Sequence, residues 1–376
     1  MTVHRDIHIY ENAREFGIKC LAPFMCTLED HPSELGKLFA FLKEDGYTGL
    51  CVSKDNGGKG YTYLQSAMAY EGIAYGDPIA GLVLQLHDSN ILSLEQVGDQ
   101  VAEVVQECVS GKKLLAFAFT EETSGSDPSG NLGKAIKKEG SYHLSGEKHW
   151  TTLGASAGYF MTFLSKSEER GMYLFLLDKD SPGLKTRPMQ PLACGNMIGA
   201  NIVDFNGCVV PETNMLSEDG YRLGLLGIDI ARIFVPALCV GLAQRALDET
   251  VSFLRTRYSM KSTILEKSSI QFELAEMDAK IEAARRLLYY TATALDMKDP
   301  RFSLIAAKNK LFAPAVAQEM AGKCVQLHGG QGLYQDSYPA RALNCSRMFS
   351  IMDGTSEIQK FIIGRKLGKE GGVMNA

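Results

Sequence analysis

The sequence predicts an α+β chain of several domains, in which helices come first, a run of antiparallel strands follows, and a bundle of helices closes the chain. Three observations predict this order. Apolar residues recur with helical spacing at first, short alternating segments separated by turn residues come next, and long one-sided apolar stripes then return. We therefore expect a helical domain over residues 1–112, a β-domain over 113–221 and a helical bundle over 222–376.

The N-terminal part is expected to consist of helices and one tight loop. Residues 34–44 carry a one-sided apolar stripe formed by Leu35, Leu38, Phe39 and Leu42. Three further helical patterns cover about residues 62–75, 79–97 and 101–110. The glycine-rich run 56–60 breaks the helical period and predicts a loop.

The middle part is expected to be a β-domain. Six short segments are apolar or alternating and are separated by Gly, Ser, Asp and Pro, namely residues 114–120, 133–138, 142–146, 158–164, 172–177 and 202–205. No helix of useful length fits between them, although a parallel doubly wound sheet requires such helices. An antiparallel barrel or sandwich is therefore favoured.

Long helices with one apolar face are expected in the C-terminal part. Their stripes are Val240, Leu247, Val251 and Leu254, then Met277, Ile281, Ala284 and Leu288, then Ile305, Phe312, Val316, Met320 and Leu327. Three or four such helices indicate a bundle, and we interpret the stripes as its core. Pro314 lies inside the third pattern and should kink that helix or mark its start.

Length, charge and cysteine pattern exclude several classes of protein. The 376 residues suffice for two or three domains, and a net charge of -5 offers no basic field to nucleic acid. The nine cysteines are odd in number and form no CxxC, which indicates reduced thiols rather than disulfides or a metal site. We find no apolar leader and no window approaching about 18 uninterrupted apolar residues. We therefore expect a cytoplasmic protein without a membrane span.

Two segments of the middle part have the composition of a ligand site. Within residues 117–127 a strand runs into a loop dense in hydroxyl groups and glycine, which suits a flavin edge or a phosphate but also an ordinary surface loop. Within residues 146–154, Trp150 and Thr152 stand two apart on an expected strand, so their side chains should point the same way. An indole beside a hydroxyl can cover a flavin ring, with a core tryptophan as the alternative.

A third segment, residues 351–359, reads Ile-Met-Asp-Gly-Thr-Ser-Glu-Ile-Gln. An aspartate before Gly-Thr is by itself typical of a turn or of a helix N-cap. Taken together with the two upstream segments, however, Asp353 becomes the candidate base of a flavin enzyme.

Seven ordered motifs make the chain resemble the acyl-CoA dehydrogenase family over almost its full length. They are Phe-Thr-Glu…Gly-Ser-Asp at 119–127, Gly-Glu-Lys-His-Trp at 146–150, Val-Pro at 210–211, Val-Gly-Leu-Ala-Gln-Arg-Ala-Leu-Asp at 240–248, Leu-Ala-Glu-Met at 274–277, His-Gly-Gly-Gln-Gly at 328–332 and Asp-Gly-Thr-Ser-Glu-Ile-Gln at 353–359. The resemblance implies an N-terminal helical domain, a middle antiparallel β-domain and a C-terminal four-helix bundle. It also implies FAD and a homotetramer or homodimer.

The resemblance further implies which residues hold FAD. Thr120 and Thr152 would contact the isoalloxazine, Trp150 would pack on it, and Ser126 would lie near the flavin phosphate or the substrate. The other implied contacts are Arg257, which would reach the FAD of a neighbouring subunit, and Gln326, Gly329, Gly330, Thr355 and Glu357. Electrons would pass to an electron-transfer flavoprotein or another acceptor.

The family reaction removes two hydrogens from an acyl thioester. A carboxylate takes the α-proton, and the β-hydrogen passes to flavin N5 as hydride. The usual base is a glutamate, and Asp353 stands in its place with a side chain one methylene shorter. Some members carry the base on the first long C-terminal helix, but that position is Ala231 here, which cannot be a base. The resemblance therefore assigns the base to Asp353.

Three further residues are substrate candidates by resemblance. Asp229 and Arg232 flank the alternative base position, and Asp229 would serve the structure or the pantetheine of the thioester. Asp88 lies in a region where relatives that act on alicyclic thioesters carry an aspartate for a second, remote proton. A helix cap or a surface pair is the alternative for Asp88.

The chain departs from the family pattern in two places. The expected Arg-x-x-Phe-Gly reads Arg257-Tyr258-Ser259-Met260-Lys261, and the glutamine that usually follows is Ser268, which affects the FAD contact between subunits. Residues 192–200 differ from the usual loop and resemble branches that oxidise acyl groups bound to a carrier protein. The expected substrate is therefore an acyl thioester of CoA or of a carrier protein.

Two alternatives to a thioester dehydrogenase stay open at this point. The nitroalkane-oxidising branch of the superfamily also has aspartate at the base position, although its arginine seven positions further on is Lys360 here. A flavin oxidase of a non-thioester carbon acid is therefore one alternative. The altered region 257–268 would also fit a non-catalytic relative that binds FAD or a partner.

Overall fold

The computed structural model describes residues 6–24, 35–167, 170–193 and 195–373. The chain forms two compact units. The helical unit comprises residues 1–25, 62–82 and 232–376, and the mixed unit comprises residues 26–61 and 83–231. Glu34 of the first expected helix and Cys194 of the 192–200 segment lie outside the described residues.

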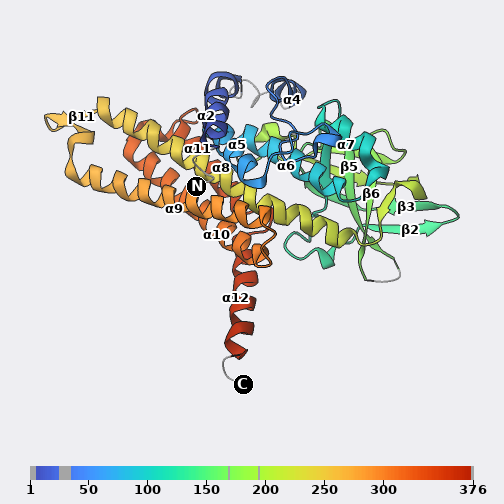
Figure 1. Ribbon diagram of the computed structural model, residues 1–376. Coiled ribbons are helices and arrows are strands. Elements are labelled where there is room, and N and C mark those ends of the chain that lie inside the picture. Colours follow the sequence, from blue (N-terminus) through green and yellow to red (C-terminus); the bar gives the residue numbers. More distant parts are fainter. Residues whose placement is uncertain (1–5, 25–34, 168–169, 194, 374–376) are drawn as a thin grey trace. The chain divides into compact units, whose positions relative to one another are not determined.

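Long helices build the helical unit (Figure 1). They are α2 (Ile7–Phe16), α5 (Tyr63–Gly76), most of α8 (Gly220–Thr256), α9 (Ser268–Asp296), α10 (Phe302–His328), α11 (Tyr338–Phe349) and α12 (Ser356–Val373), with a short hairpin of β11 (Tyr258–Ser259) and β12 (Ser262–Thr263) between α8 and α9. Thr62 begins α5 with a capping box, in which its side chain accepts from the Gln65 amide. The expected helical bundle is confirmed.

The apolar stripes place the core of the helical unit. The stripe of α9 is buried in full, as predicted. On α10 the prediction was wrong at Phe312, which is 40% exposed. Of the two outcomes expected for Pro314, the helix start is excluded, because α10 begins at Phe302 and continues to His328. Buried packing around Pro314 sustains the helix despite the lost backbone donor.

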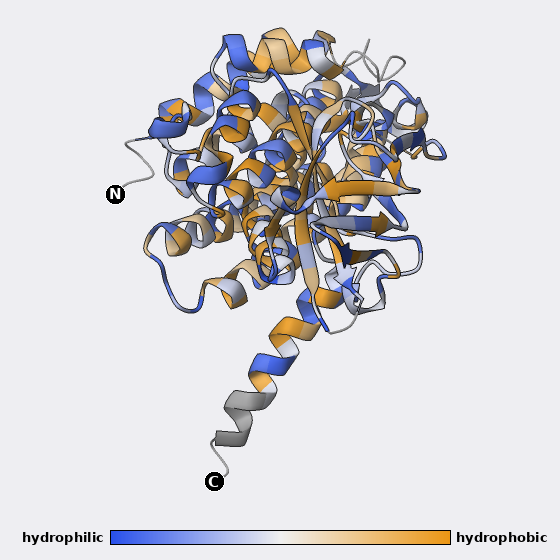
Figure 2. Cartoon of the chain, turned by 90° about the vertical axis from the view of Figure 1, so that its right-hand side faces the viewer, coloured by the Kyte–Doolittle hydropathy of each residue, from blue (hydrophilic) through white to orange (hydrophobic). Residues whose placement is uncertain are grey.

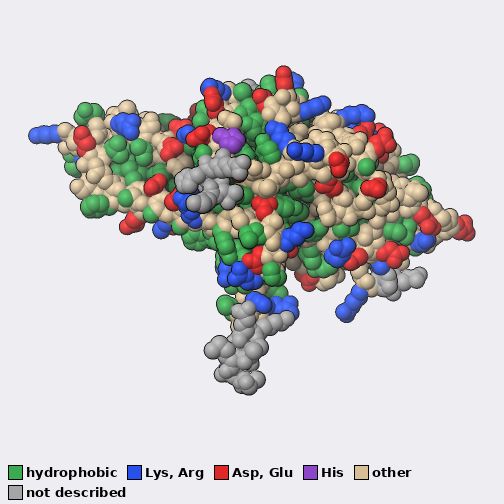
Figure 3. Space-filling model, viewed as in Figure 1, with side chains coloured by type: hydrophobic (Ala, Val, Ile, Leu, Met, Phe, Trp, Pro, Cys, Tyr) green, Lys and Arg blue, Asp and Glu red, His purple; other side chains and the backbone are tan. Residues whose placement is uncertain are grey.

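Helix α12 projects from the rest of the helical unit (Figures 1 and 2). Apolar and polar residues are mixed along it, and Phe361 and Leu367 remain 58% and 61% exposed. Basic and hydrophobic side chains stand together on the projecting helix in Figure 3.

The two larger sheets lie in the mixed unit. A seven-stranded sheet joins β1 (Leu114–Ala118), β2 (Lys134–Lys138), β3 (Ser141–Ser145), β5 (Ala157–Lys166), β6 (Met172–Asp178), β9 (Cys208–Pro211) and β10 (Met215–Ser217), and a three-stranded sheet joins β4 (Glu147–Thr151), β8 (Asn201–Phe205) and β7 (Leu184–Pro188). Most pairs are antiparallel, as predicted. The exceptions are β1 and β2, which pair with β5 in parallel. The long chain segments between these partners permit parallel pairing without a helix.

Three helices of the mixed unit follow the sequence pattern closely. They are α4 (Leu35–Glu44), the greater part of α6 (Pro78–Glu95) and α7 (Ala102–Val109). All four residues of the predicted α4 stripe are buried. By length and composition α8 could cross a membrane, but 72% of its most apolar stretch is buried inside the protein. That burial is what a core helix shows.

Candidate active site

Asp353 lies in the short connection between α11 and α12. Its backbone is left-handed, with a φ of 51°, and Gly354 follows with a φ of 91°. The residue as a whole is half-buried, but its Oδ2 atom is buried and has no hydrogen-bond partner within the described part of the chain. A buried carboxyl oxygen with a free lone pair is what a proton acceptor requires.

Two buried cations stand near Asp353. Lys310 of α10 is 1% exposed, and its Nζ donates hydrogen bonds to the carbonyl oxygens of Phe349 and Gly354 at 2.8 and 3.4 Å. Arg232 of α8 is 6% exposed, and its Nη2 lies 3.2 Å from where a Cβ on Gly354 would stand. The positive charges favour the ionised form of the carboxyl.

Burial is the largest influence on the pKa of Asp353 and decides that this pKa rises. Removal from water raises that pKa above its ordinary value, and the charges of Lys310 and Arg232 oppose the rise. Burial likewise lowers the pKa of Lys310 to about 8, against the opposing effect of Asp353. A carboxylate with a raised pKa is a stronger base, so the surroundings of Asp353 suit proton abstraction.

Of the three substrate candidates, the helical unit brings Arg232 together with Asp353. Asp229 and Ala231 belong to the mixed unit, where Asp229 is half-buried and Ala231 is buried. Lys360, the residue that the nitroalkane-oxidising branch would need as a partner of the base, is 62% exposed and pairs with Glu357 at 3.6 Å. This placement gives no support to the oxidase alternative.

Asp88 holds the backbone of a neighbouring loop. Its two carboxylate oxygens accept hydrogen bonds from the amides of Gly49 and Leu50 at 2.9 and 3.1 Å. Asp88 is fully buried on α6, beside His87, whose ring bonds the carbonyl of Cys108 and the amide of Leu115. The geometry favours a structural role for Asp88 over the remote proton transfer considered from the sequence.

A buried ion pair stabilises the hydroxyl-rich loop of the mixed unit. Lys148 is fully buried, and its Nζ donates to Glu121 Oε1 at 2.7 Å and to the Phe119 carbonyl at 3.2 Å. The same carboxylate accepts from the amides of Leu132 and Gly133. These bonds fix the backbone on both sides of Thr120, whose side chain is half-buried.

Trp150 is exposed rather than part of the core. Its side chain is 48% exposed, and its backbone is left-handed with a φ of 50°. The pairing of β4 with β8 shifts register between Lys148 and Thr151, and β4 ends at Thr151. Strand alternation therefore does not extend to Thr152, and the premise used to place Thr152 beside Trp150 was wrong. A bulge caused the error, since it adds a residue and breaks the period of two.

Ser126 is exposed in the mixed unit, and the other FAD candidates lie in the helical unit, where most of them are exposed. They are Arg257, Gln326, Gly329, Gly330 and Glu357, with Thr355 half-buried. A Cβ added to Gly329 or Gly330 would meet no atom within 4 Å, so nothing in the chain itself crowds these glycines. Thr355 caps α12 by accepting from the Ile358 amide at 3.3 Å. The glycine pair therefore leaves room for a ligand group close to its backbone.

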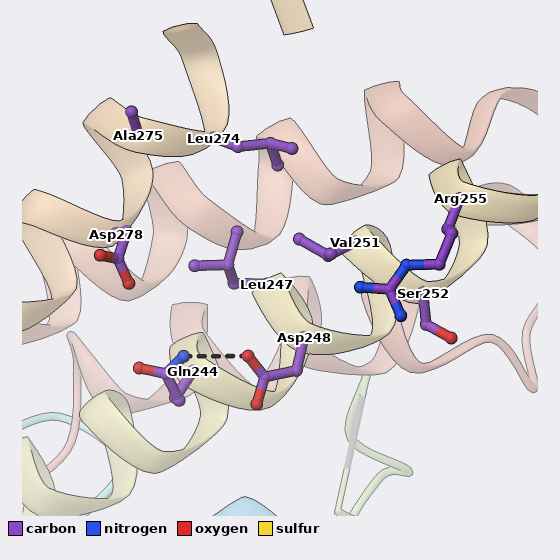
Figure 4. Close-up of a pocket in the computed structure, with 9 residues that line it drawn as sticks. All are labelled: Gln244, Leu247, Asp248, Val251, Ser252, Arg255, Leu274, Ala275 and Asp278. Carbon is purple, nitrogen blue, oxygen red and sulfur yellow. Dashed lines mark hydrogen bonds between the residues drawn. The ribbon is translucent and has the colours of Figure 1, made fainter. Parts of the chain in front are cut away.

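A pocket of the helical unit lies elsewhere, between α8 and α9. It has a volume of about 510 Å³, and Figure 4 shows Gln244 bonded to Asp248 at its wall. None of the predicted site residues lines it. The chemistry assigned to Asp353 therefore does not depend on this pocket.

The sequence did not predict the roles of three residues around the candidate site. They are Lys310, which lies beside Asp353, and the buried pair of Lys148 and Glu121. A signal was present for the lysines. Lys310 stands in the apolar pattern of α10, and Lys148 stands on a strand of the predicted β-domain. A charged residue at a buried position of a periodic pattern indicates a paired or hydrogen-bonded group.

Family models cover nearly the whole chain. Residues 5–112, 116–208 and 218–368 match the N-terminal, middle and C-terminal domains of acyl-CoA dehydrogenase. An acyl-CoA dehydrogenase of Bacillus subtilis is 30% identical over 94% of this chain and 95% of its own length. The chain belongs to the acyl-CoA dehydrogenase family. The three-domain fold predicted from the sequence is thereby confirmed.

Solved structures agree with the family. A butyryl-CoA dehydrogenase from Megasphaera elsdenii superposes with a TM-score of 0.88 at 28% identity and covers 96% of this chain and 97% of its own. An acyl-CoA dehydrogenase from Bacillus anthracis, solved with FAD, gives a TM-score of 0.92 at 25% identity over 99% of this chain and 68% of its own. This member of the acyl-CoA dehydrogenase family is thus an FAD-dependent oxidoreductase of CH–CH donors.

Proposed function

We propose that this protein dehydrogenates an acyl thioester between the α- and β-carbons and that Asp353 removes the α-proton. The observation that carries the proposal is the buried Oδ2 of Asp353, which has no hydrogen-bond partner in the described chain and lies in a site whose burial raises the pKa of the carboxyl. Membership of the family supports the reaction type.

Asp353 would accept the proton at Oδ2 and hold it there after the reaction. When bound, FAD supplies the acceptor for the β-hydrogen as hydride. The positive charges of Lys310 and Arg232 favour the ionised form of Asp353 and oppose the rise in its pKa that burial causes. Exclusion of water from this carboxyl strengthens each of these interactions, because the local dielectric constant is low.

We propose that FAD is bound by the residues that the family resemblance implies. Thr120, Ser126, Trp150 and Thr152 would serve the flavin ring and phosphate. The rest of the FAD would use Arg257, Gln326, Gly329, Gly330, Thr355 and Glu357. The exposed indole of Trp150 and the open space above the glycine pair support this assignment.

The substrate would be an acyl group on CoA or on a carrier protein, contacted by Arg232 and Asp229. Electrons would leave to an electron-transfer flavoprotein or another acceptor. We further propose a homotetramer or homodimer in the cytoplasm. The exposed apolar side chains of α12 support an assembly of several copies.

Anaerobic titration of the flavin-loaded protein tests the proposal. Acyl-CoAs and acyl carrier proteins of varied chain length should bleach the flavin absorbance of the wild-type protein. Asp353→Asn should keep bound flavin and lose bleaching, whereas the control Asp336→Asn, at an exposed aspartate of the same unit, should behave as wild type. Full bleaching by Asp353→Asn would exclude Asp353 as the base.

A further inference from the structure

The connection that carries Asp353 has a backbone that needs support. α11 ends at Phe349 and α12 begins at Ser356, so few residues join the two helices. Asp353 and Gly354 both have a positive φ within this connection. Glycine adopts this region freely, but aspartate does so at a cost. Contacts from outside the connection must therefore hold Asp353 in place.

Lys310 supplies such contacts on both sides of Asp353. Its Nζ donates to the carbonyl of Phe349, the last residue of α11, and to the carbonyl of Gly354, the residue after the base. Gln359 reinforces the second point, since its Nε2 also donates to the Gly354 carbonyl at 2.9 Å. One ammonium group therefore ties the two ends of the segment that presents the carboxyl.

The charge of Lys310 is placed where it also acts on that carboxyl. A buried ammonium is costly unless hydrogen bonds and an opposite charge compensate it. The negative charge of Asp353 favours the charged form of Lys310. Cys239 acts in the same direction, and the positive charge of Arg232 acts against it. A lysine that only capped α11 would not need to reach past Asp353 to Gly354.

We propose that Lys310 is a positioning residue that fixes the backbone on both sides of Asp353 and so holds the carboxyl in one orientation for proton removal. The proposal rests on the function assigned above to Asp353. In this role Lys310 touches neither substrate nor cofactor. Its ammonium acts through the loop and through the charge that it places beside the base.

The test compares Lys310→Met with Lys308→Met, a control at an exposed lysine on the same helix. In the FAD-loaded protein without substrate, Lys310→Met should speed amide hydrogen exchange in peptides covering residues 350–356. With an active thioester, kcat should fall on the order of tenfold to a hundredfold with little change in KM, because a misplaced base loses rate rather than binding. Lys310→Arg should restore part of the rate, and Lys308→Met should change nothing.

Unchanged exchange and unchanged kcat in Lys310→Met would overturn the proposal. So would a loss of rate with unchanged exchange and lost flavin, since Lys310 would then serve cofactor binding. If Lys310→Met does not accumulate as folded protein, Lys310→Gln, which keeps a donor without the charge, carries the same comparison. Failure of every thioester to bleach the wild type would remove the proposed function, while the exchange comparison still decides whether Lys310 holds the loop.

Discussion

Glu121 and Lys148 form a buried ion pair in which Oε1 and Nζ are 2.7 Å apart. Both groups make further hydrogen bonds: the carboxylate also accepts from two backbone amides, and the ammonium also donates to a backbone carbonyl. The pair fixes the strand end and loop on which Thr120 stands. A buried pair of this kind is sensitive to the loss of one member more than to the loss of both.

Glu121→Gln should therefore destabilise the protein strongly. It leaves the ammonium of Lys148 buried without a counter-charge, and we expect a loss of about 3–5 kcal/mol in the free energy of unfolding. Urea unfolding of the flavin-loaded protein measures it. Glu122→Gln is the matched control, because Glu122 is the exposed neighbour. Equal stability of the two variants would show that the pair is dispensable.

Replacement of Asp353 should stabilise the protein in a pH-dependent way. The pKa of Asp353 is raised in the folded state, so folding favours the protonated form. Below the ordinary pKa of 3.8 the carboxyl is protonated whether folded or unfolded and imposes no penalty. As pH rises, the unfolded chain gains stability by ionising, and native stability falls until pH passes the folded-state pKa.

Asp353→Asn does not titrate and escapes this penalty. The unfolding free energy of the variant minus that of the wild type should therefore grow with pH above about 4 and then level off. Urea unfolding at several pH values between about 4.5 and about 8 measures the difference. If this difference in unfolding free energy shrinks as pH rises, the charges of Lys310 and Arg232 outweigh the effect of burial on the pKa of Asp353.

Arg232→Met should move the acidic side of the profile of kcat/KM against pH to higher pH. kcat/KM should rise with pH as Asp353 ionises, with an apparent pKa above the ordinary 3.8. Loss of the Arg232 charge removes one of the two effects that oppose burial, so the pKa of Asp353 should rise further. Arg286→Met, at an arginine with 67% side-chain exposure, is the control. An acidic side that stays in place would show that Arg232 does not act on the base.

Replacement of exposed apolar residues on α12 by charged residues should weaken self-association of the protein. Phe361 and Leu367 are exposed on this projecting helix, and burial of such side chains drives assembly. The double variant Phe361→Asp and Leu367→Asp should have a lower mass than the wild type by light scattering at equal concentration. Lys360→Asp, an exposed change on the same helix, controls for added negative charge. A wild type of monomeric mass, or a variant of unchanged mass, would contradict the role of α12.

Much of the fold was readable in advance because its signals are local. The stripes of α4 and α9 repeat with the helical period and were buried where expected. Errors arose where tertiary packing overrides the local signal. Pro314 lies inside the helix that it might have started, β5 pairs with β1 and β2 in parallel, and β4 shifts register after Lys148 and ends before Thr152.

The sequence by itself determined the family, the order of helices and strands, and Asp353 as the candidate base, since each follows from short local patterns and from their order along the chain. Only the tertiary structure decided the surroundings of that base. Lys310 and Arg232 come from helices far from Asp353 in sequence, and Asp88 proved to hold a loop. Burial and charge proximity are properties of packed neighbours, so no local pattern could assign them.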